Sequence, residues 1–561
     1  MEHRTAARIV IWALAATAAC GKDSTGPAAP TCSSALASQL TLAVGAYASI
    51  DPASDAGCVT FPANMSVDSA EYLLVAQSAA ATFGQAAAFS LRSATLQATT
   101  MPLAQRLVQP ASPRAAAALF DGRLRARGRA LRFPQLPAPA PAPAPASRTA
   151  PTAAAAPASP PIVGTLRSFV VCAKLDCSQF KRVGARARAV GAHVAIYVDT
   201  LAPANGLDSA DVDTLKQVFD ARLYPLDSTA FGAVSDVDTN GVVIALMTPV
   251  VNALVTKAAC DSSGYIAGFF FPDDLDPSAP ATSSNHGEIF YSIVADPNAT
   301  LSCAHTSAGV KTGTPGTFVH ELQHMINFAQ HVLVHGGSVT EEGWLDEGLS
   351  KYAEELAGRS YLQQGDTVTF SQYAFNEVDD AYKYLSATGA SPLLIEFDQG
   401  TLAEVGASWL FTRYLVDQYG AALPGQLVQT TLAGAANVAA QTGHRFDTTV
   451  TRWALANWVS DLPGFATPAE LSYTSWHFRT RTFASLHQQD PNHFPLPYPL
   501  APTTSAGSAV NLSGTLRSGS GVYGRALQAP GAAAFTLLFS GGPPASVFTG
   551  AVPRLTVIRI R

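Results

Sequence analysis

The feature that most constrains the fold is a set of polar residues inside a strongly apolar segment. His320 and His324 flank Glu321 within Thr317–Phe328, where six other positions are apolar. On an α-helix, residues four apart stack on one face, so the two imidazoles lie one turn apart. A helix this apolar is expected to be buried, and buried polar side chains need partners. The segment therefore predicts a core helix whose two histidines bind one Zn²⁺.

The same spacing of two histidines around a glutamate also arises by chance in helices that bind no metal. The apolar flanks argue against that alternative, because they leave the histidines little access to solvent. Thr314–Thr317 contains threonine, proline and glycine, a combination typical of a helix start. Glu321, next to the first histidine, is then placed to act as a general base toward a water molecule at the metal.

A second helical pattern, Gly343–Leu356, follows and contains the run Trp-Leu-Asp-Glu-Gly-Leu-Ser. Together with His-Glu-Leu-Gln-His-Met-Ile-Asn-Phe, it most resembles the hyicolysin family of secreted bacterial metallopeptidases, a branch of the gluzincins. The specific match covers about residues 320–355, with a looser likeness from near Val163 to near Asp461. The resemblance implies that Glu347 is the third zinc ligand. It also implies an α+β zincin domain, with a mixed sheet over the active-site helix, a helical lobe and a substrate cleft between them.

Several residues near this motif have open roles. Asp346 stands where the family usually has asparagine, so the resemblance does not define what this position orients. Glu354 lies two turns after Glu347 on the same face. It either hydrogen-bonds a zinc-binding histidine or is an ordinary solvated carboxylate. Many gluzincins also use a downstream tyrosine or histidine to stabilise the oxyanion; the candidates are Tyr382, Tyr384, Tyr414 and His444.

The resemblance implies a zinc endopeptidase that acts on proteins or peptides, with Glu321 as the general base. The metzincin alternative fails, because Asn327 and Gln330 occupy its glycine and third-histidine positions and His331 is one residue out of register. An alternative from another class is a surface lipoprotein whose inactive zincin scaffold serves as a binding module. The intact Glu321 favours the enzyme. The net charge of −6 gives no indication of nucleic-acid binding.

Residues 1–19 have the composition of an export signal. Two arginines precede the apolar run Ile9–Ala16, and small residues follow before Cys20. Small residues directly before a cysteine resemble the bacterial lipoprotein signal. This predicts lipid on Cys20, hence membrane attachment at the cell surface or outer membrane. Thr17 stands where an aliphatic residue is usual, so plain secretion is the alternative. The apolar run is too short for a permanent spanning helix.

Six cysteines remain after Cys20, an even number that suits disulfides in an oxidising compartment. About fifteen connectivities exist for six cysteines. Order along the chain suggests the pairs Cys32–Cys58, Cys172–Cys177 and Cys260–Cys303. A cysteine–zinc site is a weaker alternative, because the chain contains no C-x-x-C pair.

The composition changes along the chain in a way that predicts a catalytic domain flanked by small all-β domains. Residues 20–132 predict an N-terminal β domain that ends in a basic stretch. Residues 133–162 are rich in proline and alanine and predict an extended linker. Residues 163–490 form the expected zincin domain, and residues 500–561 a C-terminal β module. By resemblance, Glu288–Ile293 is the candidate cleft-edge strand that pairs with substrate.

The basic stretch is expected to be a solvated face of a helix or linker, in preference to a membrane or ligand site. Its arginines are Arg123, Arg125, Arg127, Arg129 and Arg132.

Asp236–Gly241 matches the first half of an EF-hand calcium loop, with the pattern D-x-D-x-N-G. The loop's last position falls on Met247, where a bidentate carboxylate is required. A bound Ca²⁺ and a simple turn entering the next strand are therefore the two alternatives.

Overall fold

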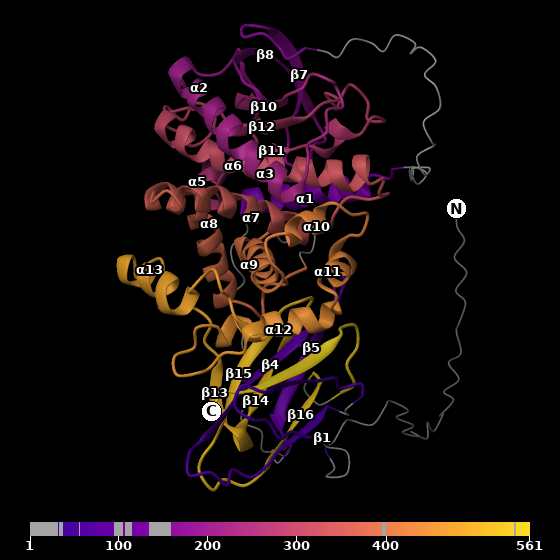
Figure 1. Cartoon of the computed structure of the whole chain (residues 1–561), viewed down its shortest axis with the longest axis vertical. Coiled ribbons are helices and arrows are strands. Elements are labelled where there is room, and N and C mark those ends of the chain that lie inside the picture. Colours follow the sequence, from indigo (N-terminus) through magenta and orange to yellow (C-terminus); the bar gives the residue numbers. More distant parts are fainter. Residues whose placement is uncertain are drawn as a thin grey trace, which may run out of the picture.

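The computed structural model of the chain (Figure 1) describes residues 32, 38–54, 57–94, 105–106, 115–133, 159–394, 400–542 and 546–561. The predicted export signal, Cys20 and most of the Pro/Ala-rich linker lie outside these residues. A mixed sheet with helices occupies one end of the molecule, a helical lobe the middle and a second β structure the other end. No helix within the described ranges is long and apolar enough to cross a membrane.

The mixed sheet has six strands in the order β11-β12-β10-β9-β8-β7. The strands are β7 (Leu166–Cys172), β8 (Phe180–Val190), β9 (Val194–Asp199), β10 (Val243–Met247), β11 (Gly268–Phe270) and β12 (Ile289–Ser292). The strands β9, β10 and β12 are parallel, β8 is antiparallel to both of its neighbours, and β11 is antiparallel to β12. The prediction that Glu288–Ile293 forms the cleft edge is wrong, because β11 pairs with β12 and is itself the edge strand.

Helix α6 (Ser307–Phe328) carries the histidines and packs against β11 and β12. Thr306 caps it, since its side-chain oxygen accepts the Gly309 N–H at 3.0 Å. The predicted start at Thr314–Thr317 is wrong: the helix begins at Ser307 and passes through Pro315. Proline removes one backbone donor inside a helix. The helix continues because its apolar residues on both sides of the proline are buried in the core.

The remaining helices, apart from α1 (Ala116–Ala130), are the smaller ones around the sheet and those of the helical lobe. Around the sheet lie α2 (Ser209–Val218), α3 (Tyr224–Phe231), α4 (Pro249–Asn252) and α5 (Lys257–Ser263). The lobe contains α7 (Gly343–Leu362), α8 (Thr367–Ser386), α9 (Leu402–Tyr419), α10 (Leu423–Val428), α11 (Gly434–Thr442), α12 (Phe446–Val459) and α13 (Phe483–Gln489). Helix α7 contacts α6, α8 and α9, so it joins the sheet-bearing unit to the lobe.

The second β structure is a two-layer sandwich built from both ends of the chain (Figure 1). One sheet has the order β1-β3-β16-β5-β14-β6 and the other β13-β15-β4-β17-β2. The early strands are β1 (Ser38–Gln39), β2 (Tyr47–Ile50), β3 (Cys58–Phe61), β4 (Ala70–Ser78), β5 (Ala86–Ser93) and β6 (Gln105–Arg106). The late strands are β13 (Thr503–Ala506), β14 (Asn511–Arg517), β15 (Gly521–Gln528), β16 (Phe535–Gly541) and β17 (Pro553–Arg559).

This arrangement corrects the expectation of two separate flanking β domains. The early strand β4 lies between the late strands β15 and β17, and β5 lies between β16 and β14. Neither terminal segment can therefore complete a sheet alone. Phe61 of the early segment stacks on Phe535 of the late one at 4.4 Å between ring centroids, so the sandwich core is also shared.

Alternation along β4 explains how the sandwich attaches to the helical lobe. Successive strand residues point to opposite faces. Leu74 belongs to the sandwich core, whereas Leu73 and Val75 belong to the larger core that includes the lobe. The hydroxyl of Tyr523 on β15 donates to the Ala454 carbonyl of α12 at 2.8 Å. The sandwich and the lobe therefore share one packed interface.

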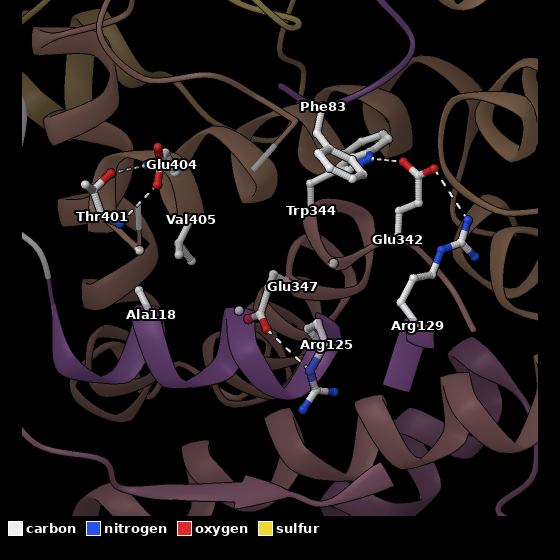
Figure 2. Close-up of a pocket in the computed structure, with 13 residues that line it drawn as sticks. Phe83, Ala118, Arg125, Arg129, Glu342, Trp344, Glu347, Thr401, Glu404 and Val405 are labelled. Atoms are coloured by element: carbon white, nitrogen blue, oxygen red, sulfur yellow. Dashed lines mark hydrogen bonds and ion pairs between the residues drawn. The ribbon is translucent and has the colours of Figure 1, made fainter. Parts of the chain in front are cut away.

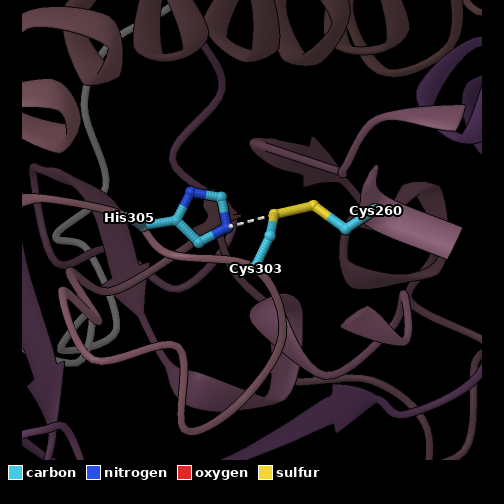
Figure 3. Close-up of side chains that lie close together, drawn as sticks. All are labelled: Cys260, Cys303 and His305. Carbon is cyan, nitrogen blue, oxygen red and sulfur yellow. Dashed lines mark hydrogen bonds between the residues drawn. A yellow bond between two sulfur atoms is a disulfide. The ribbon is translucent and has the colours of Figure 1, made fainter. Parts of the chain in front are cut away.

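All three predicted disulfides form: Cys32–Cys58, Cys172–Cys177 and Cys260–Cys303. The first lies within the early β segment, the second closes the turn between β7 and β8, and the third ties α5 to the segment before α6. His305 approaches the third, with its Nε2 3.6 Å from Cys303 Sγ (Figure 3). Because both sulfurs are consumed in the bond, this cluster offers no thiolate pair for a metal.

The interleaved sheets predict the behaviour of a chain cut between its two halves. We expect that a site-specific protease site inserted within residues 134–158, once cleaved, leaves the two pieces associated, because β4 and β5 each have late strands as both neighbours. No disulfide described joins the pieces. Gel filtration checks this: co-elution without denaturant and separation in denaturant are expected, whereas separation without denaturant contradicts the shared sandwich.

Candidate metal centre

The residues predicted to bind zinc lie together in the structure. His320 and His324 project from α6, and Glu347 comes from the first turns of α7. The two Nε2 atoms are 3.1 Å apart, and each is 3.6 Å from an oxygen of Glu347. One ligand atom from each residue lies within 4.8 Å of the others. Two imidazole nitrogens and a carboxylate therefore face one point, the donor set of a catalytic zinc site.

Each histidine is held by a carboxylate at its other nitrogen. The Nδ1 of His320 is 2.8 Å from Glu354 Oε1, and the Nδ1 of His324 is 3.0 Å from Asp346 Oδ2. The hydroxyl of Ser350 also lies 3.0 Å from the His324 Nδ1. A carboxylate at Nδ1 holds a proton there and leaves the Nε2 lone pair for a metal. Glu354 is therefore a partner of His320, not a solvated carboxylate, and Asp346 is the partner of His324.

The arrangement has the chemistry of a cation site. Glu347 is 4% exposed, and its Oε1 is buried with no hydrogen-bond partner in the part of the chain that the structure describes. Burial opposes ionisation of Glu347, but His324 and His320 outweigh it and lower its pKa to about 2. Burial likewise opposes the charged form of His320, but Glu347 and Glu354 raise its pKa. The acidic groups around the two histidines thus favour added positive charge here, which a divalent cation held by the Nε2 lone pairs of the neutral imidazoles and by the ionised Glu347 would supply.

Glu321 lies between this centre and the sheet. Its Oε2 accepts the backbone N–H of Phe270 at 2.7 Å, and the side chain is 4% exposed. Phe270 ends β11, so the edge strand itself orients the predicted general base. Sequence reasoning identified Glu321 but placed the edge strand at the wrong segment.

A single glycine lets α7 bring Glu347 to the histidines. A Cβ at Gly348 would overlap Thr412 Oγ1 and would lie only 2.7 Å from the Ser408 carbonyl oxygen of α9. Such distances are too short for any other residue. The glycine after Glu347 therefore fixes how closely α7 packs against α9, and with it the position of the third ligand.

The basic stretch is not one uniformly solvated face. Its first four arginines belong to α1 (Ala116–Ala130), which passes beside Glu347 (Figure 2), and Arg132 follows the helix. Arg125 is 7% exposed, and its guanidinium lies 3.3 Å from Asp346 Oδ2 and 3.9 Å from Glu347 Oε1. It also donates to the Phe270 carbonyl at 3.3 Å. The prediction of a solvated stretch is therefore wrong for Arg125.

Helix α1 also brings a carboxyl group to the centre. Burial raises the pKa of Asp121, and the nearby carboxylates of Glu347 and Glu321 raise it further. On the outer side of the metal centre, a pocket lies between α1 and the lobe (Figure 2). Its walls include Gly122, Arg125, Trp344, Glu347, Glu404 and Val405. The apolar spacing of Phe120, Leu124 and Gly128 was the sequence signal that this helix has a buried face.

The tyrosines considered for oxyanion stabilisation have structural partners. The hydroxyl of Tyr382 bonds to the backbone of Leu496, and that of Tyr414 donates to the Glu470 carbonyl. Tyr384 stacks on a tryptophan in the lobe core, at 5.5 Å between ring centroids. The ring of His444 packs near that of Tyr419. These contacts assign the four residues to packing of the helical lobe.

Comparison with known proteins agrees with this chemistry. No family model matches the chain. A neutral metalloprotease from Staphylococcus hyicus, ShpI, is 25% identical over 258 residues, which are 45% of this chain and 51% of that protein. The chain thus spans about half the length of this curated relative. The similarity supports a metallopeptidase family for the chain, in agreement with the resemblance of its two helical motifs to the hyicolysins.

Proposed function

We propose that the protein is an exported zinc endopeptidase whose catalytic zinc is held by His320, His324 and Glu347. The observation that carries the proposal is the convergence of both Nε2 atoms and the Glu347 carboxylate, with Glu321 beside them. Similarity to a metalloprotease supports the same reaction class. Zinc held there would supply Lewis-acid chemistry, since it polarises a peptide carbonyl and makes water a better nucleophile at neutral pH.

The protein's own groups then account for proton transfer. Because Oε2 of Glu321 accepts the Phe270 N–H, Oε1 is the oxygen that takes a proton from the attacking water. The same oxygen returns the proton to the departing amine. Glu354 and Asp346 keep the two imidazoles in the orientation that presents Nε2. The edge strand β11 offers backbone groups with which an extended peptide can pair.

Export rests on the sequence and on the disulfides. The signal-like residues 1–19 and the three disulfides suit an oxidising compartment outside the cytoplasm. Lipid on Cys20 would attach the protein to a membrane at the cell surface or outer membrane, and plain secretion is the alternative. A non-enzymatic binding module on an inactive zincin scaffold is the rival function, and an intact Glu321 held by the edge strand favours the enzyme.

Zinc content tests the ligand assignment. We expect one tightly bound zinc per wild-type chain and a loss of zinc in Glu347→Ala and His324→Ala, because each change removes one of three ligand side chains. Glu354→Gln should weaken binding by about 10- to 100-fold, since it alters only the partner of His320. Elemental analysis after dialysis against a graded chelator measures all four proteins. Equal zinc in wild type and Glu347→Ala contradicts Glu347 as a ligand.

Glu321→Gln separates chemistry from metal binding. The amide has nearly the same size but cannot accept a proton from water, so hydrolysis of a quenched fluorescent peptide should fall by about 10² to 10⁴. Zinc content should remain at the wild-type level. Glu470→Gln, in the lobe beside Tyr47, is the matched control and should keep full activity. Equal rates for wild type and Glu321→Gln would remove Glu321 from the mechanism.

A further inference from the structure

A second cluster of carboxylates lies at the start of two neighbouring strands. Asp236 and Asp238 belong to the loop before β10, and Glu288 immediately precedes β12. One oxygen from each of the three lies within 4.8 Å of the others. Strands β10 and β12 are parallel neighbours, with Ile244 opposite Ile289. The sheet therefore brings together acidic residues that are far apart in the sequence.

Glu288 is the unusual member of the cluster. It is 1% exposed, and its Oε1 accepts the Ser235 hydroxyl at 2.6 Å and the Val237 N–H at 2.9 Å. Its Oε2 is buried and has no hydrogen-bond partner among the described residues. A buried carboxylate oxygen without a partner is costly and calls for a bound group. Arg167, whose Nη1 lies 3.7 Å from Asp238 Oδ2, supplies one positive charge against the three acidic side chains.

We propose that Asp236, Asp238 and Glu288 bind a calcium ion. The EF-hand-like loop that begins at Asp236 has no carboxylate at its last position, because that position is Met247, which lies in β10. The structure supplies that carboxylate from Glu288 instead. The loop backbone has the expected form, with Gly241 at φ +75°, where glycine is favoured. Carboxylate oxygens without nitrogen or sulfur donors select a hard cation.

The ligands of this site also indicate how tightly it would bind calcium and which part of the fold the ion would stabilise. The amide nitrogen of Asn240, not its oxygen, faces Asp238 Oδ2 at 2.8 Å. Water would therefore complete the coordination, and a Kd of about 10⁻⁴ to 10⁻³ M, as in extracellular calcium modules, is expected. The ion would join the starts of β10 and β12. Since β12 supports the edge strand β11, it would stabilise the sheet that carries the candidate substrate edge.

Calcium titration of the zinc-loaded full chain tests this site. With CaCl₂ raised to about 10 mM, isothermal titration should give one calcium site per wild-type chain, and the melting temperature should rise. Asp236→Asn and Glu288→Gln should each weaken binding at least about tenfold, because each removes one charged ligand. Asp213→Asn, on α2 beside Lys216, is the control and should bind like wild type. No binding in wild type, or equal binding in all four proteins, would overturn the proposal.

The contacts of α1 bear on regulation of the metal centre. The inference drawn from them rests on the proposed function. Helix α1 spans from the edge strand to α7. Arg125 occupies the carbonyl of Phe270, which an extended substrate would need as an acceptor, and also approaches Glu347. Arg127 binds both oxygens of Asp273 at 2.8 and 2.7 Å, just beyond β11. Phe120 and Phe269 also pack edge to face, at 5.2 Å between ring centroids.

We infer that α1 is an autoinhibitory segment that must leave before a peptide can pair with β11. Its ionic contacts match the acidic groups around the centre: Asp346, Glu347 and Asp273 receive Arg125 and Arg127. Substrate and α1 compete for the same edge, so the activity of the intact chain is set by the fraction of molecules in which α1 is displaced.

Loosening α1 without touching the zinc ligands tests this inference. Arg127→Glu places a carboxylate against Asp273, and kcat/KM of the full chain on a quenched fluorescent peptide should rise at least about tenfold. Arg132→Glu makes the same charge change at an exposed residue whose described hydrogen bonds go to nearby backbone carbonyls, and it should leave the rate unchanged. Zinc content should be equal in all proteins.

The outcomes separate the two ideas. Cleavage by wild type and Arg127→Glu at equal rates, or slower cleavage by the variant, overturns autoinhibition and leaves the proposed peptidase intact. Failure of zinc-loaded wild type and both variants to cleave any peptide of a diverse panel contradicts the peptidase itself, and autoinhibition with it.

Discussion

The structure depends on the hydrogen bonds that carboxylates of α7 make to the two histidines of α6. Glu354 and Asp346 meet the outer nitrogens of His320 and His324 at 2.8 and 3.0 Å. Four ionisable groups are thereby paired in the protein core, where charged groups without partners are strongly unfavourable. Their mutual pairing makes burial tolerable, and the inward-facing Nε2 atoms and Glu347 leave one place for a cation. The close packing of α7 against α9 at Gly348 helps to fix the position of Glu347 in this arrangement.

The metal centre is also linked to the sheet and to the chain's first helix. Phe270 is the meeting point: its N–H holds Glu321, and its carbonyl accepts Arg125. One residue at the sheet edge therefore orients the proposed base and anchors the segment that covers it. The chain reaches α1 from the β-sandwich, whose strands come from both termini. Cutting the chain after α1 would free one end of that helix while the sandwich retained the other.

Local sequence patterns identified the parts of the site that depend on local spacing. His320, Glu321 and His324 lie within two turns of one helix, so their relation follows from helix geometry alone. The third ligand required a family resemblance, because its position depends on how α7 packs against α6. Three of the wrong predictions involve long-range pairing: the edge strand, the second β module and the buried Arg125. The pairing of β4 with β15 and β17 joins segments that are far apart in the sequence and share no local pattern. Glu288 likewise reaches Asp236 and Asp238 only through the pairing of β10 with β12.

The helix start was also misplaced for a physical reason. Thr314, Pro315 and Gly316 carry the local signals of a beginning, yet the helix starts at Ser307. Burial of Val310 and Phe318 on either side of the proline outweighed the lost backbone donor. Tertiary packing thus overrode a local preference, as it did for the arginines of α1.

X-ray absorption at the zinc edge of the zinc-loaded full chain tests the central claim most directly. Two histidine nitrogens and a carboxylate oxygen predict a shell of light atoms at about 2.0–2.2 Å, with the multiple-scattering signature of two imidazoles and no sulfur. In His324→Ala, any zinc that remains should show one imidazole fewer. A sulfur shell near 2.3 Å, or an unchanged imidazole signature in His324→Ala, would contradict the assignment of the metal centre.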